Sequence, residues 1–144
     1  MSWELFIENK LINCQRDGHV YCNVLTDAII LDLQGKTLAT TGISMNYEDA
    51  QNLKKFFEQV INTILYLKLG DRKYRILHFE QNKLAYIRDG EVGGTVAKSN
   101  TLYIIGFFNN NKIYTYDGKK KIQCPGMCNT VVEELANELK SDGF

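Results

Sequence analysis

The stretch Leu102-Tyr103-Ile104-Ile105-Gly106-Phe107-Phe108 is apolar apart from its single glycine and carries no charged side chain. A strand with one solvent-exposed face alternates apolar and polar residues, whereas a strand buried on both faces is apolar throughout. The run is also short for a helix. We therefore predict a strand over residues 102–108 that is buried on both faces and lies at the centre of a sheet.

The segments around this run predict further strands joined by tight turns. Gln34-Gly35, Gly70-Asp71, Asp89-Gly90 and Asp117-Gly118 are typical turn sequences. Successive strands joined by short turns favour an antiparallel sheet. The two strands on either side of Asp117-Gly118 are expected to form a protruding hairpin, because the second of them has little apolar content. The additional strands are predicted at residues 24–33, 36–41, 65–67, 74–77, 84–87, 113–116 and 119–122.

Three segments show the apolar periodicity of amphipathic helices. The first is predicted over residues 2–12, the second begins near Asn46, and the third runs from Pro125 to about Lys140. Asn46 followed by Asp49 resembles a capping arrangement. The apolar faces are Trp3, Phe6, Ile7 and Leu11, then Ala50, Leu53, Phe57, Val60, Ile61 and Ile64, and finally Cys128, Val131, Val132, Leu135, Ala136 and Leu139.

The composition is that of an ordinary globular protein. The chain has 144 residues, of which 44% are apolar and 24% charged, with 17 basic and 17 acidic side chains. No linker divides it, so we expect one domain over residues 1–144. Zero net charge argues against nucleic acid as a partner. Without a signal sequence or membrane span, the expected location is the cytosol, where the four cysteines are reduced.

The sequence contains no recognisable catalytic motif, so we expect neither an enzyme nor a cofactor. His19 and His78 are the only imidazoles, and neither lies in a nucleophile motif. The alternative is a thiol- or metal-dependent activity at the cysteines, which predicts bound zinc or a reactive thiol. Their spacing does not form paired zinc knuckles, so no metal site is expected at Cys14, His19, Cys22, Cys124 and Cys128.

Five segments together resemble the profilin family. Pro125–Leu135, with the sequence PGMCNTVVEEL, is similar to the profilin terminal helix almost residue for residue, and Ser2–Ile7 resembles the profilin N-terminus. The remaining segments resemble the first strand, the Leu-Gly-Gly-x-Lys-Tyr hairpin and the Ile-Arg…Gly-Gly segment, and they are Ala28-Ile29-Ile30, Leu69–Tyr74, and Ile87-Arg88 with Gly93-Gly94.

The resemblance implies a fold and a function. The fold is an α/β fold of the α+β type, in which N- and C-terminal helices cover one face of a central antiparallel sheet and smaller helices cover the other. The function is binding of monomeric actin, with regulation of its polymerisation and nucleotide exchange, in the cytoplasm and cytoskeleton. Partners with proline-rich segments, such as formins, are also implied. The implied actin-binding residues are Lys73, Tyr74, Arg88, Lys98, Gly126, Asn129, Thr130 and Glu133.

The implied polyproline site departs from the family pattern. Profilins bind polyproline between the terminal helices with aromatic rings that also donate hydrogen bonds. Trp3 is retained. Four other positions lack an aromatic ring or a hydrogen-bond donor that the family commonly has there, and they are Phe6, Leu38, Glu138 and Phe144. Several such losses predict weak or altered polyproline binding. Alternatively, Trp3 and Phe6 only pack the two helices together.

Residues 109–124 form a longer segment than the corresponding family loop. Its lysines could add to or obstruct the actin interface, bind acidic phosphoinositides at a membrane surface, or remain solvated. They are Lys112, Lys119, Lys120 and Lys121. A profilin-shaped adaptor without productive actin exchange is the corresponding alternative function. Residues 61–121 carry 11 basic and 5 acidic side chains, so this part of the chain is complementary to acidic actin.

Overall fold

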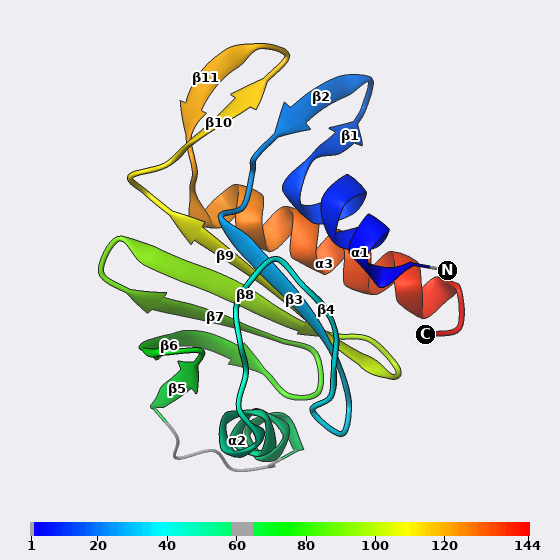
Figure 1. Ribbon diagram of the computed structural model, residues 1–144, viewed down its shortest axis with the longest axis vertical. Coiled ribbons are helices and arrows are strands. Elements are labelled where there is room, and N and C mark those ends of the chain that lie inside the picture. The colour runs from blue at the N-terminus through cyan, green and yellow to red at the C-terminus, as the bar shows by residue number, and fades with distance from the viewer. Residues whose placement is uncertain (1, 59–64) are drawn as a thin grey trace.

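The computed structural model describes residues 2–58 and 65–144 (Figure 1). Short strands and turns occupy most of the chain, and a 17-residue helix lies near its C-terminus. The elements are α1 (Trp3–Phe6), the π-helix η1 (Ile7–Ile12), β1 (Cys14–Arg16), β2 (His19–Cys22), β3 (Asp27–Asp32), β4 (Thr37–Thr40), α2 (Tyr47–Glu58), β5 (Tyr66–Leu69), β6 (Arg72–Glu80), β7 (Leu84–Asp89), β8 (Val92–Lys98), β9 (Leu102–Asn109), β10 (Ile113–Tyr116), β11 (Lys119–Ile122) and α3 (Pro125–Ser141).

The main sheet has seven antiparallel strands in the order β4-β3-β9-β8-β7-β6-β5. Every residue of β9 from Leu102 to Phe108 is buried, which confirms the predicted burial on both faces. The predicted central position is held by β8 instead, and β9 lies beside it. The antiparallel arrangement and the strands predicted in this sheet are confirmed, whereas β8 itself was not predicted.

The side chains of β9 point alternately into two separate cores, one on each face of the sheet. Ile104 and Phe108 contribute to a core shared with α1, η1 and α3. Tyr103, Ile105 and Phe107 contribute to a second core, which α2 covers. The terminal helices therefore lie on one face and α2 on the other, as Figure 1 shows.

The three predicted helices are present, with local differences. The first changes from an α-helix to a π-helix, and Asn13 N donates to Glu8 O over 2.9 Å at its end. The capping predicted for the second is confirmed, because Asn46 Oδ1 accepts from Asp49 N over 2.7 Å. Its predicted apolar positions Val60, Ile61 and Ile64 lie outside the described residues.

A second sheet, in the order β1-β2-β10-β11, was missed by the sequence analysis. The hairpin β10-β11 projects as predicted, but it does so together with β1-β2, because Tyr116 of β10 pairs with Tyr21 of β2. Asp117 joins the two hairpin tips by accepting from Val20 N over 2.7 Å and by pairing with His19 over 2.6 Å. Segments far apart in the sequence thus form one projecting sheet (Figure 1).

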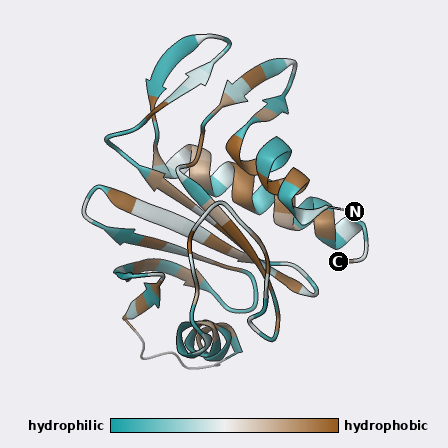
Figure 2. Cartoon of the chain, in the orientation of Figure 1, coloured by the Kyte–Doolittle hydropathy of each residue, from teal (hydrophilic) through white to brown (hydrophobic). Residues whose placement is uncertain are grey.

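The hydropathy of the surface follows this arrangement. Figure 2 shows that β11 is mostly hydrophilic, in contrast to β9. Within the described segments, no helix combines the length and the apolar character required to cross a membrane.

The contact between α3 and β9 depends on Gly106. A Cβ atom at this position would lie 2.6 Å from Val132 Cγ2 of α3 and 2.7 Å from Leu25 Cδ1. Both distances are well below van der Waals contact, so the missing side chain allows the helix to approach the sheet.

We expect Gly106→Ala to lower the free energy of unfolding by about 2 kcal/mol, because the added methyl group overpacks this contact. Denaturant unfolding monitored by circular dichroism measures the change. Gly126→Ala is the matched control, since nothing lies within 4 Å of the corresponding Cβ position. Equal stability of the two variants would show that the Gly106 contact is not tightly packed.

Candidate functional site

An exposed surface lies where α3 leaves part of the main sheet uncovered. α3 packs against β8 and β9, whereas β6 and β7 extend beyond it. Arg75 of β6 pairs with Arg88 of β7, so these two side chains are on the same face of the sheet. Leu77 lies near them and is 51% exposed. The surface therefore combines two cations with an exposed aliphatic side chain.

Arg88 is held in a defined position on this surface. Its Nε donates to Gly90 O over 2.8 Å, and its guanidinium carbon lies 5.4 Å from the centre of the Phe108 ring. This is within the range of a cation–π interaction. Phe108 belongs to the core under α3, so the core fixes the place of the cation.

The first half of α3 is joined to β7 and β8 by polar contacts. Tyr86 Oη donates to Glu133 Oε2 over 2.8 Å, and Thr95 Oγ1 donates to Asn129 Oδ1. Burial and the Glu133 contact raise the pKa of Tyr86 to about 12, so the phenol remains a donor at neutral pH. A small pocket of about 110 Å³ separates the strands from the helix start and is lined partly by Leu77, Arg88, Phe108, Pro125 and Asn129.

The residues that the resemblance assigns to actin binding divide into three groups. Arg88 and Asn129 line the same small pocket, and Glu133, four residues after Asn129 on α3, joins them through its contact with Tyr86. Gly126 and Thr130 are one turn apart at the start of α3, where Thr130 Oγ1 donates to Gly126 O over 2.8 Å.

Three further residues of this set lie outside the small pocket that Arg88 and Asn129 line. Lys73 places its Nζ 4.5 Å from the centre of the Tyr66 ring, toward the edge of the sheet. Lys98, at the end of β8, lines a different small pocket with Glu133 and Lys140. Tyr74 is separate from the others, because it is 4% exposed and belongs to the core under α2.

The sequence analysis did not select Leu77 and Tyr86 for this surface. Tyr86 precedes Arg88 by two residues on one strand, so alternation would have placed both on one face. Leu77 lies at an irregularity of the strand pairing between Ile76 and His78, for which the sequence has no clear signal.

An aromatic cluster lies between the terminal helices. The Trp3 ring centre is 5.5 Å from that of Phe6 and 5.4 Å from that of Phe144, and Leu38 packs against the same core. Glu138 points toward η1 instead and pairs with Lys10 over 3.3 Å. Of the five residues assigned to polyproline binding, only Trp3 has a side-chain hydrogen-bond donor, because Phe6, Leu38 and Phe144 have no polar side-chain atoms and an ionised Glu138 only accepts.

The lysine-rich segment occupies the open edge of the second sheet. Every residue of β11, including Lys119, Lys120 and Lys121, is exposed, and Lys112 lies in the turn before β10. Ile113 and Ile122 are register partners and are 54% and 64% exposed. The edge thus combines cations with exposed aliphatic side chains, and it leads directly into the start of α3 (Figure 1).

The cysteines are free thiols rather than parts of a ligand cluster. Burial raises the pKa of the Cys128 thiol to about 12, and its Sγ donates to Gly106 O over 3.4 Å. Burial also raises the pKa of Cys14. In residues 2–58 and 65–144, no three His, Cys, Asp or Glu side chains come together as a metal ion would require.

The comparisons with known proteins agree on one family. The family model described as profilin matches residues 1–144. Profilin IA of Acanthamoeba castellanii is similar in structure, with 26% identity over 99% of this chain and 100% of that chain and a TM-score of 0.74.

Two solved complexes share the fold at lower identity. LokiProfilin1 in complex with rabbit actin is 17% identical over 81% of this chain and 84% of that chain, with a TM-score of 0.62. Mouse profilin IIa in complex with a double repeat from the FH1 domain of mDia1 is 16% identical over 83% of this chain and 89% of that chain, with a TM-score of 0.61.

Proposed function

This chain belongs to the profilin family, and we propose that it binds monomeric actin and regulates actin polymerisation. The observation that carries the proposal is the convergence of Arg88 from β7 with Asn129 from the start of α3, beside Tyr86, which donates to Glu133. A solved complex of LokiProfilin1 with rabbit actin has the same fold, which supports actin as the class of partner.

The chemistry of the surface suits an acidic partner. Arg75 and Arg88 lie on one face of the sheet. In the sequence, residues 61–121 have an excess of basic side chains. Opposite charges on two partners increase the rate of encounter and fix their relative orientation. Leu77 supplies apolar contact beside the cations. Arg88 is therefore the anchor of the interface, with Asn129 and Glu133 as its neighbours.

The finer parts of the proposal concern what binding does. We propose that the chain changes the rate of nucleotide exchange on the actin that it binds. The same proposal treats it as a binding protein without catalysis, located in the cytoplasm with the actin cytoskeleton. The alternative is an adaptor of the same shape that does not alter exchange.

We also propose that this chain binds proline-rich segments weakly. Polyproline presents backbone carbonyls, which recruit N–H and O–H donors from an aromatic surface. Here Trp3 has a donor, whereas Phe6 and Phe144 have rings without one. Glu138 is engaged with Lys10. The aromatic cluster therefore retains apolar contact area and loses hydrogen bonds.

A second candidate function is docking to acidic phosphoinositides through β10 and β11. The exposed pair Ile113 and Ile122 lies beside three consecutive lysines on the open edge of the sheet. Aliphatic side chains that enter a lipid interface, together with cations that attract anionic headgroups, are typical of membrane-surface binding.

The actin proposal predicts that Arg88→Glu weakens binding of monomeric actin about tenfold or more, because it reverses the charge of the anchor. Fluorescence titration of labelled actin measures the affinity. Lys55→Glu is the control, since it makes the same charge change on an exposed position of α2, across the sheet. Equal affinity of both variants would exclude this surface.

Release of a fluorescent nucleotide from actin in the same titration tests the finer proposal. We expect the wild-type protein to change the release rate. Binding without such a change would favour the adaptor and leave the actin interface intact.

The polyproline proposal predicts that Phe6→Tyr strengthens binding of a proline-rich peptide about fivefold, because it restores one hydrogen-bond donor. Fluorescence of Trp3, which lies in the cluster, reports the titration. Leu5→Tyr adds the same group at a position of α1 that is 59% exposed, and it should have little effect. Low-micromolar binding by the wild-type protein would contradict the proposed loss.

The membrane proposal predicts that Lys119→Ala with Lys120→Ala lowers binding to vesicles containing phosphatidylinositol bisphosphate about tenfold or more. Co-sedimentation at fixed lipid concentration measures the bound fraction. The control is Lys54→Ala with Lys55→Ala, which removes the same charge from α2. A similar loss in both variants would show that net charge, and not this edge, determines binding.

A further inference from the structure

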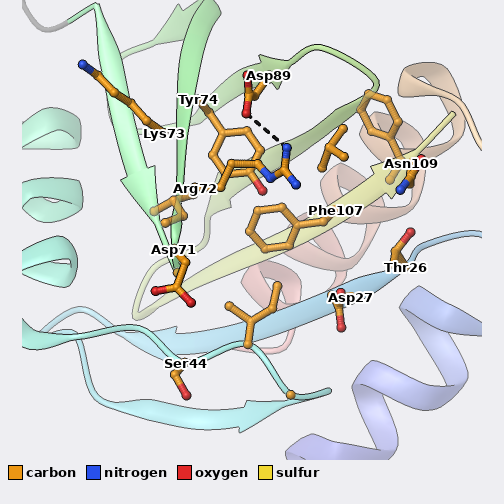
Figure 3. Close-up of a pocket in the computed structure, with 16 residues that line it drawn as sticks. Thr26, Asp27, Ser44, Asp71, Arg72, Lys73, Tyr74, Asp89, Phe107 and Asn109 are labelled. Atoms are coloured by element: carbon orange, nitrogen blue, oxygen red, sulfur yellow. Dashed lines mark hydrogen bonds and ion pairs between the residues drawn. The ribbon is translucent and has the colours of Figure 1, made fainter. Parts of the chain in front are cut away.

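A large pocket lies on the α2 side of the main sheet, at one end of its strands. The pocket has a volume of about 860 Å³, which is in the range of small-ligand sites. The two edges of the sheet meet at its border, where a Cβ on Gly70 would lie 3.4 Å from Ile43 Cγ2. Tyr74 and Phe107 form an aromatic lining, with ring centres 5.6 Å apart (Figure 3).

The Tyr74 hydroxyl is available to a ligand in this pocket. The residue is 4% exposed, and no hydrogen bond joins its Oη to another described residue. Figure 3 shows the ring directed into the pocket. Burial raises the pKa of Tyr74 to about 12, so the hydroxyl is protonated at neutral pH and can donate to an acceptor.

The charges around the pocket are predominantly negative. Asp27 and Asp71 lie on one side, and neither pairs with a cation within residues 2–58 and 65–144. Arg72 lies on the other side, where Asp89 neutralises it over 3.1 Å. Lys73 extends away from the pocket in Figure 3, toward the Tyr66 ring. The unbalanced charge is therefore that of two carboxylates.

We propose that this pocket binds an arginine side chain on an extended segment of a partner protein. A guanidinium group in the pocket can donate to the carboxylates of Asp27 and Asp71, of which Asp27 also accepts from Thr41 Oγ1 over 2.8 Å. The backbone carbonyls of the same segment supply the acceptor for the Tyr74 hydroxyl. The site is independent of the actin proposal, because Tyr74 and Arg88 lie on opposite faces of the sheet.

The test uses a blocked glycine-arginine-glycine tripeptide and follows the backbone amide signals of the protein by NMR. We expect concentration-dependent shifts confined to residues 26–27, 42–44, 69–74, 89, 92 and 107–109, which line the pocket. The same tripeptide with citrulline in place of arginine keeps the shape and loses the charge. Equal shifts with both tripeptides, or no shifts up to about 10 mM, would overturn the proposal.

Variants distinguish the parts of the site. Asp27→Asn and Asp71→Asn should each lower the affinity for the arginine tripeptide about threefold. Asp142→Asn, beyond the end of α3, should leave this affinity unchanged. Tyr74→Phe should weaken binding of the tripeptide but not binding of agmatine, because agmatine carries the guanidinium group without a backbone carbonyl. If agmatine binds as tightly as the tripeptide to the wild-type protein, the ligand is a free cation and the proposed peptide is wrong.

Discussion

The close packing of α3 on β9 is the constraint on which the rest of the structure depends. Gly106 allows the helix to approach the strand, and Cys128 Sγ fills the adjacent space by donating to its carbonyl. With the helix in this position, its first half contacts Tyr86 and Thr95, and its second half contacts Lys10 and approaches the aromatic cluster. One packing contact therefore positions both the proposed actin surface and the proposed polyproline surface.

The main sheet also separates the functions that we assign to it. Arg88 and Tyr74 come from neighbouring strands but point to opposite faces, one beside α3 and the other into the α2 core. Two partners could therefore be bound at once without sharing a side chain. The separation follows because successive side chains along a strand point to opposite faces of the sheet.

The parts of the fold that were predictable from sequence are those determined by local patterns. The burial of residues 102–108 and the capping by Asn46 each depend on a few adjacent residues. The pairing of Tyr21 with Tyr116 could not be predicted, because it depends on contact between distant segments. The convergence of Arg88 with Asn129 came from the family resemblance alone. The buried position of Tyr74 did have a signal, since Lys73-Tyr74-Arg75-Ile76 alternates between polar and apolar.

The second sheet has a consequence for the order of folding. Its two hairpins are held together by the pairing of β2 with β10 and by Asp117 at the tips, which lies 97 residues after its partner Val20. Contacts between such distant residues form slowly, because a long loop must close first. During synthesis, β1 and β2 can pair with each other, but the other edge of β2 has no partner strand until residues 113–122 leave the ribosome. The edge of β2 is therefore exposed to other chains for most of translation, and the completed protein covers it with β10.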